Sequence, residues 1–144
     1  MHKVYLKPGK EESLKRFHPW IFSGAISRFD GEPEEGEVVE VYTSKKEFIA
    51  EGHFQIGSIA VRVLSFRQEP INHDFWKRKL EIAYDMRCAI GIAINPVNDT
   101  YRLVHGEGDN LPGLVIDIYA KTAVMHDYRR VALPSCKLTR QECT

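Results

Sequence analysis

Apolar residues in the first 70 positions of the chain occur in short runs separated by polar turns. The runs predict β-strands at residues 4–6, 25–29, 37–42, 48–54 and 60–66. Turn signals lie between several of these runs, at Asp30-Gly31, Ser44-Lys45 and Ile56-Gly57-Ser58. One short helix is expected at residues 10–16, with glutamates in its first turn and basic residues in its last, as the helix dipole favours. The spacing predicts a small β-barrel or sandwich.

A different pattern follows the first 70 residues. Apolar positions from Phe75 to about Ile94 share one broad face at about 100° per residue, which predicts an amphipathic helix capped by Asp74. Its apolar face holds Phe75, Trp76, Leu80, Ile82, Ala83, Met86, Ala89 and Ile90. Two apolar runs around a polar bend, from Tyr101 to Tyr119, predict a β-hairpin. After Met125 neither periodicity continues, as in a truncated chain or a shifted reading frame.

These patterns predict three segments and a fold class. Residues 1–70 are expected to form a small β domain and residues 71–125 part of an α+β domain, with residues 126–144 as an irregular tail. The expected class is therefore α+β and mainly β.

Composition limits the compartment in which the protein works. No apolar run approaches the roughly 20 residues that a membrane span needs, and no signal-peptide pattern follows Met1. The chain holds three cysteines, an odd number without a Cys-x-x-Cys pair, so a disulfide framework is a poor interpretation. We therefore expect a cytoplasmic protein with no membrane partner.

The net charge of zero argues against a uniformly basic nucleic-acid binder, but the charge is unevenly distributed. Residues 1–28 hold six Lys or Arg against two Glu, a balance of +4. Residues 29–53 hold eight acidic residues against two Lys, a balance of −6. A local basic face is thus predicted near the N-terminus.

Basic and aromatic residues are interleaved in the segment from Lys10 to Arg28. Cations attract phosphate groups and aromatic rings stack on unpaired bases, so this composition is typical of proteins that bind single-stranded or looped RNA. A structural role also fits this segment, with Trp20, Ile21 and Phe22 in a core and the basic residues as a solvated helix end. The interleaved residues are Lys10, Lys15, Arg16, Phe17, His18, Trp20, Phe22 and Arg28.

Two further hypotheses come from the second half of the chain. Glu107, Asp109 and Asp117 lie within eleven positions, and such carboxylates serve as metal ligands or as an acid and base pair in a small metal-dependent hydrolase. The same segment is rich in Gly, Asn and Pro, which a tight bend also needs. Alternatively, the apolar face of the predicted helix pairs with a second copy, giving a homodimeric assembly module. The cysteines and the six histidines have no metal-ligand spacing, so no metal site is expected from them.

Three motifs together resemble one family. They are a basic segment followed by His18-Pro-Trp-Ile-Phe-Ser-Gly-Ala25, the strands from Glu51 to Phe66, and the segment from Tyr101 to Tyr119 with its Gly-Glu-Gly-Asp-Asn-Leu-Pro-Gly sequence. The family is the RlmI-type S-adenosylmethionine-dependent methyltransferases that modify cytosine in large-subunit ribosomal RNA. Its members place a PUA domain first, a small α+β domain second and a Rossmann-like catalytic domain last.

The resemblance implies an RNA-binding part of such an enzyme. Residues 3 to about 125 match the first two family domains, and the glycine turn for S-adenosylmethionine, the Asp-Pro-Pro element and the catalytic cysteines are not found in the sequence. We therefore expect no catalytic or cofactor-binding residues in this chain, no methyl transfer by it alone, and large-subunit ribosomal RNA as its partner. The residues expected to contact RNA are Lys10, Lys15, Arg16, Phe17, His18, Trp20, Arg62 and Arg102.

Overall fold

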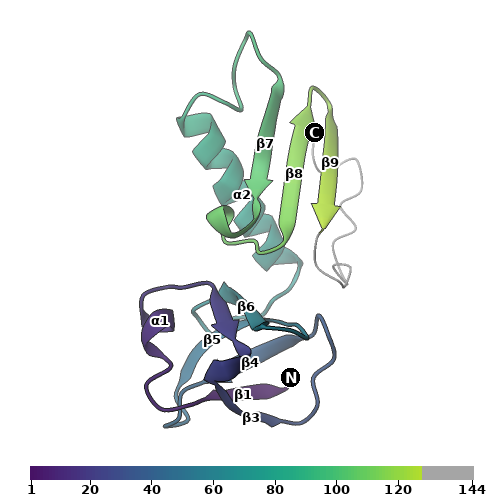
Figure 1. Ribbon diagram of the computed structural model, residues 1–144. Helices are drawn as coiled ribbons and strands as arrows, with labels where there is room; N and C mark the ends of the chain where they lie inside the picture. The colour runs from purple at the N-terminus through teal and green to yellow at the C-terminus, as the bar shows by residue number, and fades with distance from the viewer. Residues whose placement is uncertain (128–144) are drawn as a thin grey trace. The chain divides into compact units, whose positions relative to one another are not determined.

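The structure is a computed structural model that describes residues 1–127 and divides the chain into two compact units, Met1–Pro70 and Ile71–Thr144 (Figure 1). The irregular tail expected at residues 126–144 lies outside the described residues, except for its first two. His126 and Asp127 instead complete the last described strand, so the expected boundary after residue 125 falls inside that strand.

The first unit is built on a six-stranded sheet with strand order β2-β6-β5-β4-β1-β3. All neighbouring strands are antiparallel except β1 and β4, which run parallel. Its elements are β1 (Lys3–Leu6), α1 (Glu12–Lys15), β2 (Trp20–Phe22), the 3₁₀ turn η1 (Ser23–Ala25), β3 (Ile26–Asp30), β4 (Val38–Tyr42), β5 (Phe48–Phe54) and β6 (Ile59–Ser65).

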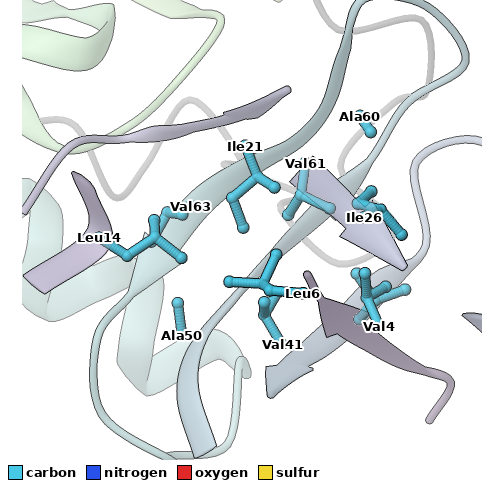
Figure 2. Close-up of a cluster of buried hydrophobic side chains, with 11 residues drawn as sticks. Val4, Leu6, Leu14, Ile21, Ile26, Val41, Ala50, Ala60, Val61 and Val63 are labelled. Carbon is cyan, nitrogen blue, oxygen red and sulfur yellow. The ribbon is translucent and has the colours of Figure 1, made fainter. Parts of the chain in front are cut away.

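The core of this unit forms where alternate side chains of the sheet point to the same side. Figure 2 shows the cluster, to which α1 adds the buried Leu14. At Gly52, where the ladder between β5 and β6 shifts register, an added Cβ would lie 2.2 Å from the carbonyl oxygen of Arg62. Glycine therefore permits a close approach of two backbones that no larger residue allows. The cluster includes Val4, Leu6, Ile21, Ile26, Val39, Val41, Ala50, Val61 and Val63.

A carboxyl group is also buried in the first unit. Glu51 on β5 is 1% exposed, and one of its side-chain oxygens accepts the backbone N–H of Glu69 at 3.2 Å. Burial, which penalises the charged form, raises the pKa of Glu51 from about 4.5 to about 7, and the nearby carboxylates of Glu69 and Glu40 add to the rise. The side chain thus links the sheet to the segment that leaves it.

The second unit combines one long helix with a three-stranded antiparallel sheet of order β7-β8-β9. Its elements are α2 (His73–Ala89), β7 (Thr100–His105), the 3₁₀ turn η2 (Gly106–Asp109), β8 (Leu114–Tyr119) and β9 (Thr122–Asp127). In Figure 1 α2 runs alongside β7. Phe75, Trp76 and Ala83 are the buried residues of the helix. The expected hairpin is present as β7 and β8, and β9 adds a third strand to it.

Three sequence expectations about α2 are wrong in detail. The helix is capped by Asn72, whose side chain accepts the Phe75 N–H at 3.1 Å, rather than by Asp74. It ends at Ala89 instead of near Ile94, because Gly91 adopts φ +76° and directs its N–H to the carbonyl of Cys88. Its buried stripe is also narrower than the predicted apolar face. Ile82, Met86 and Ile90 are exposed by 55%, 48% and 61%.

Residues 1–127 are mainly β taken together, with a second unit of α+β type, as the sequence predicts, and the five strands expected in the first 70 residues are all present. Strand β2 is additional, because a run of three residues is too short to register as a separate strand. Among residues 1–127, no helix is long and apolar enough to cross a bilayer.

Candidate nucleic-acid interface

The basic residues expected near the N-terminus reach the surface around α1. Buried Leu14 fixes this four-residue helix to the core, which leaves Lys10, Lys15 and Arg16 exposed. Lys15 donates to Glu12 at 3.3 Å, but both side chains are more than half exposed, so the pair contributes little and the lysine can exchange partners. Cationic groups are thus available on one short segment.

The chain leaves α1 through a residue in the left-handed backbone region. Phe17 has φ +61°, and its N–H donates to the Leu14 carbonyl at 2.9 Å while the His18 N–H donates to Ser13 at 3.0 Å. These bonds satisfy the carbonyl groups at the helix end. The Phe17 side chain is 72% exposed and meets the Phe66 ring edge-to-face at 5.2 Å between centroids.

Strand β2 separates its core residue from its surface aromatics. Ile21 points into the core and is 3% exposed. Its neighbours Trp20 and Phe22 point to the opposite face of the strand, where Trp20 is half-buried and Phe22 is 50% exposed. His18, Trp20 and Phe22, here called the aromatic cluster, have ring centroids 6.1 to 6.4 Å apart. The Trp20 N–H lies 3.2 Å from Nδ1 of His18, which orients the imidazole ring. Of the residues that also fitted a core role, only Ile21 belongs to the core.

Arg62 joins the aromatic cluster through strand pairing. It lies opposite Trp20 in the ladder between β2 and β6, and its guanidinium is 5.6 Å from the centroid of the Trp20 ring. Its Nε donates to Gln55 at 2.8 Å, which holds the side chain in place. Arg28, by contrast, stacks 4.0 Å above the ring of Tyr5 across β3 and β1. The spacing of Trp20 and Arg62 in sequence gave no sign that they would be neighbours.

A groove of about 330 Å³ is lined by one of the cations and by two members of the aromatic cluster. Lys10 beside α1, Ser13 in α1, and Trp20 and Phe22 of β2 are among the residues that line it. The remaining lining residues are Leu14, Ile21, Gly24 and Ala25. A positive charge and aromatic surfaces therefore meet in a single hollow, formed by α1, β2 and η1.

Arg102 belongs to the second unit, where it forms an ion pair with a carboxylate. Its Nε and Nη2 donate to the two oxygens of Asp117 at 2.7 and 3.2 Å, and these bonds lower the pKa of Asp117. Asp109 is held in the same way by Arg87, at 2.7 and 2.8 Å, and also accepts the His105 N–H at 2.6 Å. Burial raises the pKa of Asp109, but these bonds outweigh it and the net shift is downward.

Two of the three carboxylates considered for a metal-dependent hydrolase therefore serve as partners of arginines. Within residues 1–127, no three His, Cys, Asp or Glu side chains are grouped so that they could hold a metal ion. The glycines and Asn110 of the same segment form the bend itself, with φ +52° at Gly106, +56° at Asn110 and +77° at Gly113. The turn interpretation accounts for this segment.

Comparison with known proteins first defines the class of the N-terminal unit. The PUA-like domain family matches residues 4–66, which span the sheet and the groove described above. This part of the chain is a PUA-like domain, as expected from the sequence motifs.

Most of the chain has relatives among ribosomal RNA methyltransferases. It is 37% identical over 139 residues to ribosomal RNA large subunit methyltransferase I of Erwinia tasmaniensis, covering 91% of this chain and 35% of the relative. With the Vibrio cholerae protein of the same name it shares 42% identity over 117 residues, covering 81% of this chain and 29% of the relative. The chain is therefore homologous to ribosomal RNA large subunit methyltransferase I over most of its own length, which confirms the resemblance drawn from the motifs.

A solved structure supports the fold independently. A Streptococcus mutans protein described as a SAM-dependent methyltransferase superimposes with a TM-score of 0.74, covering 90% of this chain and 34% of that protein at 20% identity. At that identity the likeness establishes the fold alone. The chain spans about a third of the length of the relatives that it matches.

Proposed function

We propose that the PUA-like domain docks structured RNA, and that this RNA is large-subunit ribosomal RNA. The observation that carries the proposal is the groove lined by Lys10, Trp20 and Phe22, with Lys15 and Arg16 exposed at the adjoining end of α1. The names of the relatives supply the kind of RNA.

Affinity in this proposal comes from the cations. Lys10, Lys15 and Arg16 contact phosphates, which contribute most of the binding free energy and make it depend on salt. The zero net charge of the chain is no obstacle, because the positive balance of residues 1–28 is local.

The aromatic residues orient the RNA. His18, Trp20 and Phe17 offer ring surfaces to bases, and Arg62 supplies a guanidinium held beside Trp20. Unpaired bases stack on such rings irrespective of sequence. The aromatic cluster thus favours bent or looped RNA over a uniform duplex.

Within a complete methyltransferase the domain would deliver the RNA to a separate catalytic domain that uses S-adenosylmethionine. We expect the present chain to bind RNA without transferring methyl groups. Incubation with radiolabelled S-adenosylmethionine and ribosomal RNA measures this directly, and incorporation of label into RNA would contradict it.

A charge reversal tests the RNA-docking proposal. The triple variant Lys10→Glu, Lys15→Glu and Arg16→Glu should bind a ribosomal RNA hairpin at least tenfold more weakly than the parent, with a shallower dependence of affinity on salt. Fluorescence anisotropy at several salt concentrations measures both quantities. The matched control reverses the same number of exposed charges elsewhere, at Lys45, Lys46 and Lys121. Equal losses in the two triple variants would contradict the proposed interface.

The hypothesis of a homodimer rests on a separate observation. Ile82 and Met86 of α2 and Ile90 at its C-cap lie four residues apart along one stripe, and all three are exposed. A second copy of the chain would bury this stripe. Sedimentation velocity tests it, because replacing Ile82 and Met86 by serine should convert a dimer to a monomer, whereas a parent chain that is already monomeric would exclude it.

A further inference from the structure

Phe17 occupies a backbone conformation that does not suit its side chain. Its φ of +61° lies in the left-handed region, where the Cβ atom of any residue other than glycine crowds the backbone. The residue directly follows the C-cap of α1, the position at which helices most often place glycine. The fold requires this conformation, because the N–H groups of Phe17 and His18 both close the helix end.

Burial does not compensate for the strain. The side chain is 72% exposed, the highest fraction among the exposed phenylalanines and tyrosines in the part of the chain that the structure describes. Its ring contact with Phe66 is edge-to-face, so much of the ring remains open to solvent. Strained, exposed residues that the core does not need are found at binding sites.

The surroundings of Phe17 match those of a base-stacking residue. Arg16 precedes it and His18 follows it, and both are exposed. A cation therefore precedes the open aromatic ring in sequence, and a member of the aromatic cluster follows it.

We propose that Phe17 is displayed as a stacking platform for an unpaired base, so that the ligand of this surface is RNA with a looped or single-stranded nucleotide. This inference rests on the proposed RNA-docking function and specifies its substrate class. The left-handed conformation turns the ring outward at the end of α1, and a duplex with all its bases paired offers it no free base face.

Replacement of Phe17 by glycine distinguishes a role of the ring in RNA binding from a role in stabilising the fold. Glycine relieves the left-handed strain, so the thermal midpoint should stay the same or rise. Affinity for a hairpin with an unpaired loop should fall about 5- to 20-fold, while affinity for a fully paired duplex of equal length changes less than about twofold. Phe17→Trp should retain loop binding. Ile56→Gly is the control, because Ile56 is 71% exposed and lies in another loop.

A fluorescent base analogue in the loop supplies a second readout. Its emission should be quenched by the parent and by Phe17→Trp, and remain unquenched with Phe17→Gly at saturating protein. A lower thermal midpoint together with equal losses for both RNAs would show a structural role and overturn the inference. Unchanged loop binding by Phe17→Gly would overturn it while leaving RNA docking intact, whereas a parent chain that binds neither RNA would overturn both.

Discussion

In the first unit the basic residues Lys10, Lys15 and Arg16 reach solvent, whereas in the second unit Arg87 and Arg102 are each held by a carboxylate. The first arrangement costs little to maintain and leaves the charges available to a polyanion. The second uses guanidinium groups to satisfy Asp109 and Asp117. Basic residues of similar appearance in the sequence are therefore open to solvent in one unit and paired with carboxylates in the other, and the proposed RNA binding belongs to the first group.

Among the expected changes in stability, the loss of Arg87 should be one of the largest. The Asp109 side chain is 4% exposed and would keep a buried carboxylate without its partner, so Arg87→Ala should lower the free energy of unfolding of the second unit by about 3 kcal/mol. Urea unfolding followed by Trp76 fluorescence in a Trp20→Phe background measures it, because the two tryptophans of the chain lie in different units.

Arg102→Ala is the matched control for Arg87. The Arg102 side chain is 47% exposed, and its removal should cost less than about 1 kcal/mol. Equal losses for the two variants would show that burial does not distinguish the ion pairs.

Glu51 should make the stability of the first unit depend on pH. Its pKa is about 7 in the folded state and near 4.5 when exposed, so the folded state holds the proton more tightly. The free energy of unfolding should therefore fall as pH rises from about 4.5 to about 7, by about 3 kcal/mol in total. Glu51→Gln should largely remove this dependence. Urea titrations at several pH values, followed by Trp20 fluorescence in a Trp76→Phe background, measure it, and a profile unchanged by the variant would contradict the burial argument.

The sequence predicts elements that rest on local patterns. The alternating strands of the first unit, the 3.6-residue periodicity of α2 and the turn chemistry around Asn110 are all visible before folding. The resemblance motifs in turn identify the PUA-like domain.

The sequence does not reveal contacts between distant positions. Arg87 and Asp109 are 22 positions apart, and the buried Glu51 accepts a hydrogen bond from Glu69, which follows 18 positions later. Likewise Trp20 meets Arg62 only through the pairing of β2 with β6. Each of these features depends on the register and the path of the folded chain.

Neutralising one cation in each unit tests which unit carries the RNA-binding surface. Lys10→Gln removes a charge that lines the groove and should weaken RNA binding about fivefold, with the salt slope reduced by about 1. Arg102→Gln removes a charge that Asp117 already neutralises and should change affinity less than about twofold. Anisotropy titrations compare the two variants. A larger loss for Arg102→Gln would place the RNA surface in the second unit.

The smallest expected effect concerns how the two units start their helices. No side chain caps α1, whereas Asn72 accepts the Phe75 N–H at the start of α2. Asn72→Ala should therefore lower the free energy of unfolding of the second unit by about 0.5 to 1 kcal/mol, because one helix N–H loses its partner. Asp74→Ala should cost less, since Asp74 contributes only its charge to the first turn. Urea unfolding followed by Trp76 fluorescence measures both variants. A greater loss of stability in Asp74→Ala would indicate that Asp74, the residue predicted from the sequence, caps the helix.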